Sequence, residues 1–326
     1  MDILQPLIQS LLSPMVLAFA LGVFATLVKS DLKFPDEIYS ALTIYLLFAI
    51  GVKGGAKLDG VSLVELLRPG MVAIGLSLLI PVWCFYILHK LGKLDGINAA
   101  AIAAHYGSVS AVTFGEAVAF LEIMSISFEA FMPALLAVME VPAIILALVL
   151  ARRSVPVTAG QHGWGKILHE LLTSKGIILL MGGMAIGLLS GEKGYTQIAP
   201  LFDEPFRGVL TFFLLEVGLV TGRRLYDLKK VGPFLAVFGM VMPALHGLLG
   251  VWLGQWAGLS IGGATILGTL AASASYIAAP AAVRVALPQA NPSLYLTSSL
   301  AITFPFNVVF GIPLYYMFAK WIFGAA

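Results

Sequence analysis

His105-Tyr-Gly-Ser-Val-Ser110 is a short polar segment inside an apolar stretch of this sequence, and Ser273-Ala-Ser-Tyr-Ile-Ala-Ala-Pro280 is a second one. Pro280 lacks a backbone donor and disfavours helix at the residue before it, while Gly107 allows the first segment to open. Inside lipid, the freed backbone groups of a broken helix must be satisfied by protein, water or ligand. We therefore expect two broken membrane helices that form a binding site near the bilayer midplane.

The composition places the rest of the chain in a membrane. Of the 326 residues, 60% are hydrophobic and only 11% are charged, and the mean hydropathy is +0.97. A soluble domain carries roughly a quarter charged residues. The net charge of +2 gives no reason to expect a nucleic-acid partner. The sequence has neither a phosphate-binding loop nor a nucleophile motif, so we expect no enzyme and no cofactor.

Ten apolar stretches are long enough to cross a bilayer, which takes about 20 residues. They are residues 12–29, 38–56, 69–90, 97–121, 129–151, 174–190, 206–222, 231–257, 261–287 and 296–323. The expected fold is an all-α polytopic membrane protein with ten transmembrane helices. Residues 152–173 form the longest polar connection. They divide the chain into one half over residues 1–151 and another over residues 174–326.

The two halves show weak internal similarity. Gly51-Val-Lys-Gly-Gly-Ala-Lys-Leu58 aligns with Gly218-Leu-Val-Thr-Gly-Arg-Arg-Leu225, and Gly107-Ser-Val-Ser110 aligns with Ala272-Ser-Ala-Ser275. Because each half has an odd number of spans, homologous halves must be inverted repeats. The alternative is chance recurrence of small residues in apolar helices.

Basic residues predict the orientation. About two thirds of the 19 Lys and Arg residues fall on the side that holds residues 152–173. Cytoplasmic loops carry the excess of positive charge. We expect a multi-pass protein of the plasma (inner) membrane, with this connection in the cytoplasm and both termini on the periplasmic side.

Four serines at matching positions are candidates for the site: Ser108, Ser110, Ser273 and Ser275. Their hydroxyls suit an anion or a cation such as Na⁺, or they bond back to a carbonyl one turn earlier. Thr303 and Asn307 in the last span could add oxygen ligands, or they could be interhelical hydrogen-bonding residues.

Few charged groups lie deep in the predicted spans. Glu116, Glu140 and Glu216 are candidates for cation coupling, or they tie helices together. His105 and His246 are expected to form local hydrogen bonds. Neither has a second metal ligand at helical spacing, so no metal beyond Na⁺ is expected.

Three stretches resemble the cyanobacterial sodium-dependent bicarbonate transporter (SbtA) family: Ser30–Pro35, Ala104–Gly115 and Ala271–Arg284. The resemblance extends over nearly the whole chain. It implies Na⁺/HCO₃⁻ symport into the cell for a carbon-concentrating mechanism. It further implies an elevator-like core domain moving against a gate domain, a homotrimer, and regulation by a cytoplasmic PII-like protein (SbtB).

We assign site residues on this basis. The substrate-binding residues are Gly107, Ser108, Ser110, Thr113, Phe114, Ser273, Ala274 and Ser275. The sodium-binding residues are Ser110, Ser275, Thr303 and Asn307. Two alternatives stay open: a Na⁺-coupled transporter of another small anion, and an anion-binding membrane sensor.

Overall fold

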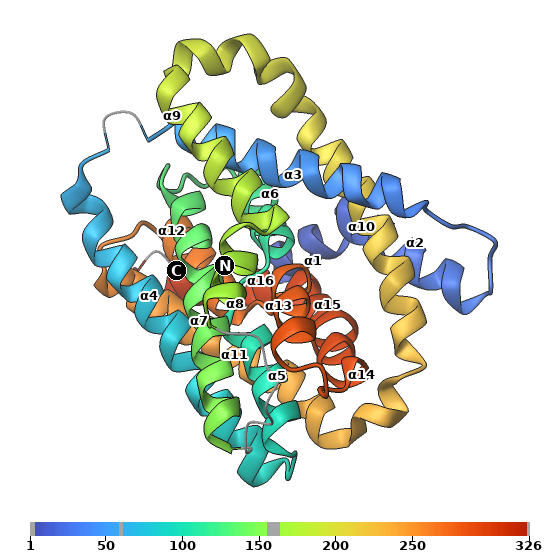
Figure 1. The fold of residues 1–326 in the computed structure, drawn as a ribbon. Coiled ribbons are helices and arrows are strands. Elements are labelled where there is room, and N and C mark those ends of the chain that lie inside the picture. The colour runs from blue at the N-terminus through green and yellow to red at the C-terminus, as the bar shows by residue number, and fades with distance from the viewer. Residues whose placement is uncertain (1–3, 59–60, 155–163, 325–326) are drawn as a thin grey trace.

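A computed structural model describes residues 4–58, 61–154 and 164–324, and all regular structure in these ranges is helical. Of the connection expected at 152–173, residues 155–163 lie outside the described residues. Figure 1 shows the helices in the colour order of the chain. They are α1 (Leu4–Leu11), α2 (Pro14–Leu27), α3 (Asp36–Ala56), α4 (Leu63–Tyr86), α5 (Gly96–Gly107), α6 (Ala111–Ile123), α7 (Met132–Ser154), α8 (Trp164–Leu172), α9 (Lys175–Phe202), α10 (Glu204–Leu225), α11 (Leu228–Trp256), α12 (Ile261–Ala272), α13 (Ala278–Ala286), α14 (Pro292–Leu296), α15 (Phe304–Phe306) and α16 (Ile312–Ile322). Three π-helical segments adjoin them: η1 (Ile87–Leu91), η2 (Thr297–Thr303) and η3 (Asn307–Gly311).

Among the described residues, seven helical segments are long and apolar enough to cross a membrane. They are Asp36–Ala56, Val64–Leu91, Met132–Ala151, Lys175–Phe202, Glu204–Leu225, Val231–Trp256 and Pro292–Ile322. The helices Pro14–Leu27 and Ile261–Ala272 are apolar but shorter. The expectation of an all-helical polytopic membrane protein is therefore confirmed.

Side-chain caps fix where several of these helices begin. Ser13, Ser62, Ser174 and Ser260 precede α2, α4, α9 and α12, and each accepts a hydrogen bond from a backbone N–H of the first turn. Such caps satisfy donors that have no partner within the helix. Because Ser62 caps α4, this helix begins at Leu63. The expectation that the third span opens at residue 69 is thus six residues late.

Glycines in the left-handed region bend two of these helices. Gly191 in α9 has a φ of 60°, and Gly232 in α11 has a φ of 78°. Both values lie in the left-handed region that glycine tolerates and L side chains rarely adopt. The predicted span 174–190 stops at the first of these bends, whereas α9 continues to Phe202.

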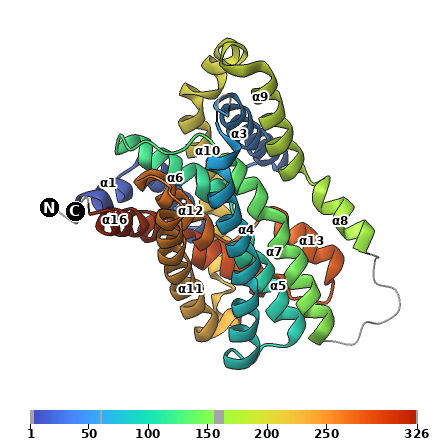
Figure 2. The ribbon, with the colours of Figure 1, turned by 90° about the vertical axis from the view of Figure 1, so that its left-hand side faces the viewer.

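Helices α2, α3, α9 and α10 form one layer, which we call the four-helix layer. Figure 1 shows them together on the upper right, and Figure 2 shows α3, α9 and α10 above α4, α5, α7 and α11. Helix α2 packs on α10 and α3 packs on α9. In both pairs the helices approach each other most closely at glycine residues. A Cβ atom at Gly218 would overlap the carbonyl oxygen of Phe19, and one at Gly187 would overlap that of Val52.

Helices α4–α7 and α11–α16 form the main bundle. Helix α4 packs on α5 and α7, and α11 packs on α12 and α16. The largest buried apolar cluster is centred in these helices and includes Leu76, Ile102, Leu135 and Leu267. The four-helix layer contacts this bundle through α3 against α6 and α7, α7 against α9, and α10 against η2.

Candidate functional site

The first expected interruption is present between α5 and α6. The chain leaves the helix after Gly107, and Ser108 and Ser110 have extended backbones with ψ of 166° and 114°. A Cβ at Gly107 would lie 2.6 Å from Cδ of Pro81 and 2.9 Å from Cβ of Ala143. Close approach of two neighbouring helices therefore requires glycine where the break begins.

The two serines of this break have different partners. The Oγ of Ser110 accepts a hydrogen bond from the N–H of Thr113 at 3.2 Å and so caps α6. The Oγ of Ser108 donates to the carbonyl oxygen of Glu140 at 3.0 Å. This second bond fastens the break to α7. The alternative of a hydroxyl bonded back into its own helix therefore describes neither serine.

The second expected interruption is present between α12 and α13, over residues 273–277. The Oγ of Ser275 accepts a hydrogen bond from the N–H of Ala279 at 3.2 Å. Pro280 stands in the first turn of α13, where the missing N–H removes no bond that the helix would otherwise form. In each break, therefore, the second serine binds a donor of the half-helix that follows.

Direct hydrogen bonds join the two breaks. The N–H of Ser110 donates to Oγ of Ser273 at 3.0 Å. This hydroxyl donates to the carbonyl oxygen of Leu270 at 2.8 Å, so the alternative of a bond back to a carbonyl one turn earlier holds for Ser273. In return, the N–H of Ser275 donates to the carbonyl oxygen of His105 at 2.8 Å. Each break thus satisfies a backbone donor of the other. Residues 163 positions apart meet at the centre of the main bundle.

The point where the two breaks meet is buried and lies beside the start of two helices. Ser108, Ser110, Ser273 and Ser275 are between 0% and 4% exposed. The amino-terminal ends of α6 and α13 follow the two breaks, and helix amino termini carry partial positive charge from unpaired N–H groups. Thr113 and Phe114, in the first turn of α6, and Ala274, within the second break, are also buried. In this structure the N–H groups of Thr113 and Ala279 at these helix starts are bonded to the hydroxyls of Ser110 and Ser275, so an anion would have to replace these bonds.

Thr303 lies beside neighbouring helices of the bundle. Its Oγ1 donates to the carbonyl oxygen of Gly239 in α11 at 2.8 Å and is 2.6 Å from the hydroxyl of Tyr106 in α5. These bonds tie the last span to α5 and α11. Within the described ranges, the hydroxyl of Thr303 bonds to these two helices and not to the serines, and its role in binding Na⁺ stays a prediction.

Asn307 reaches the second break. Its Nδ2 donates to the carbonyl oxygen of Ala272, the last residue of α12, at 2.9 Å. Its Oδ1 accepts from the hydroxyl of Tyr315 at 2.8 Å. This amide is fully buried and fixed in orientation by both bonds. The oxygen is therefore held near the break, and its proposed role as a Na⁺ ligand stays a prediction.

The three deep carboxylates lie in different surroundings. Glu116 and Glu216 are buried, and one carboxylate oxygen of each has no hydrogen-bond partner within the described part of the chain. The side chain of Glu140 lies against Gly176, at the start of α9. The histidines form the expected local bonds: His105 Nδ1 is 2.7 Å from the Ala101 carbonyl oxygen, and His246 Nε2 accepts from the Trp83 indole at 2.7 Å.

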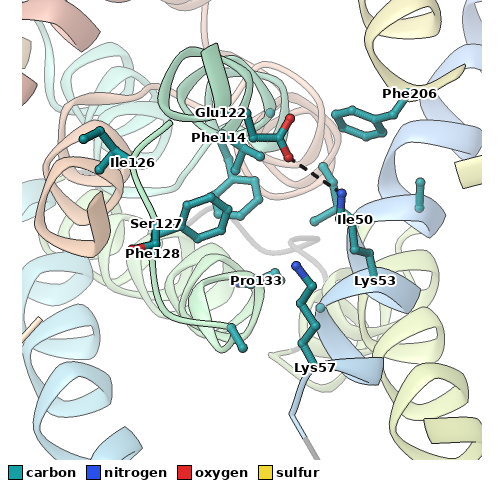
Figure 3. A pocket seen from close by; sticks show the side chains of 15 residues that line it. Ile50, Lys53, Lys57, Phe114, Glu122, Ile126, Ser127, Phe128, Pro133 and Phe206 are labelled. Carbon is teal, nitrogen blue, oxygen red and sulfur yellow. Dashed lines mark ion pairs between the residues drawn. The ribbon is translucent and has the colours of Figure 1, made fainter. Parts of the chain in front are cut away.

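A cavity of about 300 Å³ lies between the four-helix layer and the main bundle. Figure 3 shows Ile50 and Lys53 of α3 and Phe206 of α10 facing Phe114, Phe128 and Pro133. Its lining includes Phe114, which follows Ser110 by one helical turn. The cavity thus approaches the first break from one end of the molecule.

Charged groups surround the mouth of this cavity. The Nζ of Lys53 lies 2.9 Å from Asp203 and 3.7 Å from Glu122, and Glu122 also pairs with Arg207 at 3.0 Å. Sequence reasoning did not identify this cluster. The available signal was a lysine inside the predicted span 38–56, because a charge within a membrane span needs a partner or water.

Two half-helices that cross at buried serines, inside an all-helical polytopic protein, define a membrane transporter. Comparison with known proteins identifies the family. The chain belongs to the Na⁺-dependent bicarbonate transporter superfamily, whose family model matches residues 14–320. This is a transporter family and not an enzyme family. A search of curated proteins found no match.

Proposed function

We propose that this protein imports bicarbonate by symport with Na⁺ across the plasma membrane and so supplies inorganic carbon for concentration in the cell. The reciprocal bonds between the two breaks carry this proposal, because they bring two half-helix amino termini and four buried serines to one point. Bicarbonate is a small planar anion whose oxygens suit backbone N–H groups and hydroxyls. Family membership supports both ions.

The proposed substrate site consists of Gly107, Ser108, Ser110, Thr113, Phe114, Ser273, Ala274 and Ser275. The proposed Na⁺ ligands are oxygens of Ser110, Ser275, Thr303 and Asn307. A Na⁺ ion beside the anion would offset its charge, so that binding of one favours binding of the other. The division of oxygens between the two ions rests on these residues being polar, buried and close to the breaks.

The architecture that we propose is ten spans in two inverted five-helix repeats. Equivalent contacts in the four-helix layer support it: the first span, α2, packs on the seventh, α10, and the sixth, α9, packs on the second, α3. If the two halves are inverted repeats, the symmetry that relates them exchanges the α2–α10 pair with the α9–α3 pair. The aligned glycines Gly51 and Gly218 both lie at such contacts.

The four-helix layer and the main bundle are the two parts that we expect to move relative to each other. We assign the four-helix layer as the gate domain and the main bundle as the core domain, with elevator-like motion between them. The basic residues support an inward-facing connection 152–173 and periplasmic termini. A homotrimer and a cytoplasmic PII-like regulator belong to this proposal through the family resemblance alone.

The test is uptake of ¹⁴C-bicarbonate into proteoliposomes at an alkaline pH, where little CO₂ is present. We expect saturable uptake that requires an inward Na⁺ gradient. Purified, folded protein that shows no Na⁺-dependent uptake would remove the substrate assignment. Uptake of another small anion, or a signalling response without uptake, would then identify one of the two alternatives.

A further inference from the structure

The cavity beside Phe114 has features that bicarbonate does not need. Its volume of about 300 Å³ lies at the lower end of the range for small-molecule pockets. The walls are mostly apolar, with Phe114, Phe128, Phe206, Ile50, Ile126 and Pro133 among them. A hydrophilic anion as small as bicarbonate gains nothing from aromatic walls. A ligand with an apolar body would bury that body against them.

Among the described residues, one basic side chain of the cavity lining forms no close ion pair. Lys53 and Arg207 are matched by Asp203 and Glu122. Lys57 also lines the cavity; within the described residues it has no ion pair within 4.0 Å, and Asp203 interacts with it only at longer range. Figure 3 shows its ammonium group over Pro133 and turned toward the cavity.

The apolar walls and this ammonium group lie where a single small molecule could contact both. We propose that the cavity is a binding site for a small amphipathic carboxylate, with its aromatic or aliphatic body between Phe114, Phe128 and Phe206 and its carboxylate on Lys57. A charge-assisted hydrogen bond from the ammonium would fix the orientation of the ligand.

The occupant would touch both parts of the molecule. Ile50 and Lys57 belong to α3 of the four-helix layer and its carboxyl end, whereas Phe114 and Pro133 belong to α6 and α7 of the main bundle. A ligand that binds this arrangement stabilises it relative to any arrangement in which the walls separate. The site is distinct from the serine crossing and extends the proposed function.

The test measures binding without transport, so its result does not depend on whether the protein carries bicarbonate. The probe is 4-phenylbutyrate, titrated by calorimetry into the full chain in nanodiscs of neutral lipid. The uncharged amide of the same acid is the matched control ligand. We expect saturable binding of the acid and about tenfold weaker binding of the amide, because a charge-assisted bond is lost.

Three variants locate the site. Lys57→Gln should weaken binding of the acid about tenfold, and Val118→Trp, which fills the cavity, should weaken it at least as much. Lys193→Gln is the control, because this exposed lysine does not line the cavity, and it should leave binding unchanged. Lys57→Gln alters an exposed side chain and should fold normally. Absence of saturable binding, equal binding of acid and amide, or unchanged binding by Lys57→Gln would overturn the proposal.

Discussion

Ser273 forms two hydrogen bonds at the point where the two breaks meet. Its hydroxyl accepts a hydrogen bond from the backbone N–H of Ser110 in the first break. The same hydroxyl donates to the carbonyl oxygen of Leu270 in α12, the helix that leads into the second break. The side chain is 1% exposed, so water cannot easily replace it. A buried donor that loses its partner costs about 1–3 kcal/mol.

We predict that Ser273→Ala lowers Na⁺-dependent bicarbonate uptake at least about tenfold, because the N–H of Ser110 loses its acceptor and the break loses its alignment. The measurement is initial uptake rate in proteoliposomes at matched protein density. Ser77→Ala is the control: this serine is also fully buried, but its hydroxyl bonds only to Ile74 of its own helix. Equal uptake by both variants would show that the crossing does not bind the substrate.

Asp203 predicts a pH dependence of stability. Partial burial alone would raise the pKa of this carboxyl, but hydrogen bonds from Lys53 and Tyr195 outweigh it and hold the pKa below the ordinary value of 3.8. A lowered native pKa stabilises the fold above the unfolded pKa, and this contribution disappears as pH falls through the native value.

We therefore expect thermal unfolding of the wild type and Asp203→Asn to differ at neutral pH and to converge as pH falls through the native pKa of Asp203, which lies below 3.8. The wild type should be the more stable protein at neutral pH. The size of the difference is small, since the side chains of Lys53 and Asp203 are 33% and 41% exposed. A difference that persists unchanged at low pH would contradict the role of the ionised carboxylate.

The local sequence predicted the two helix breaks, but it did not predict the contact between them. Gly107 and Pro280 act on the backbone beside them, so both interruptions could be predicted. The bond between Ser110 and Ser273 joins distant positions, and no local pattern indicates which hydroxyl meets which N–H. The predicted span 174–190 ends beside the bend at Gly191, and the helix that continues beyond it was not predicted, because glycine is frequent in membrane helices and only its φ distinguishes a bend from close packing.

At the scale of elements, backbone-to-backbone contact holds the four-helix layer together. Gly183 and Gly187 of α9 face Gly51 and Gly55 of α3, four residues apart on each helix. Helices in lipid associate by such close packing, because lipid provides no hydrophobic force between them. The neighbouring Gly182 differs, because a Cβ added there would meet no atom within 4 Å in the described part of the chain. This glycine therefore faces away from α3.

This difference gives a matched pair of variants in one helix. Gly187→Ala should destabilise the protein by about 1–3 kcal/mol, because the added methyl overlaps the Val52 carbonyl. Gly182→Ala should be neutral or slightly stabilising, because alanine has the higher helix propensity. Thermal unfolding in one detergent compares them. Equal stability of the two variants would contradict the predicted α3–α9 contact.

At the scale of the whole molecule, the interface between the four-helix layer and the main bundle is where motion would occur. Gly54 of α3 and Pro133 of α7 lie in close contact across it, beside the cavity. A Cβ at Gly54 would lie 2.7 Å from Cβ of Pro133. Disulfide-linked Cβ atoms are about 3.5–4.5 Å apart, so two cysteines here need only a small separation of the helices.

We predict that a Gly54→Cys, Pro133→Cys disulfide abolishes bicarbonate uptake and that a reductant restores it, because the covalent bond prevents the layer from sliding past the bundle. The background carries Cys84→Ala, which removes the natural cysteine. Each single-cysteine variant is a control for the substitution itself. Full uptake by protein shown to be crosslinked would argue that this interface does not move during transport.

The reciprocal bonds between the breaks also constrain how the molecule is made. The amino-terminal half of the chain leaves the ribosome first. Ser110 is therefore inserted into the membrane before Ser273, whose hydroxyl accepts the hydrogen bond from the N–H of Ser110, has been synthesised. Until residues 273–275 are inserted, this central donor must use water, lipid headgroups or a temporary partner. The centre of the molecule is therefore completed last, and a ribosome that stops between the two halves leaves an open polar gap for quality control to recognise.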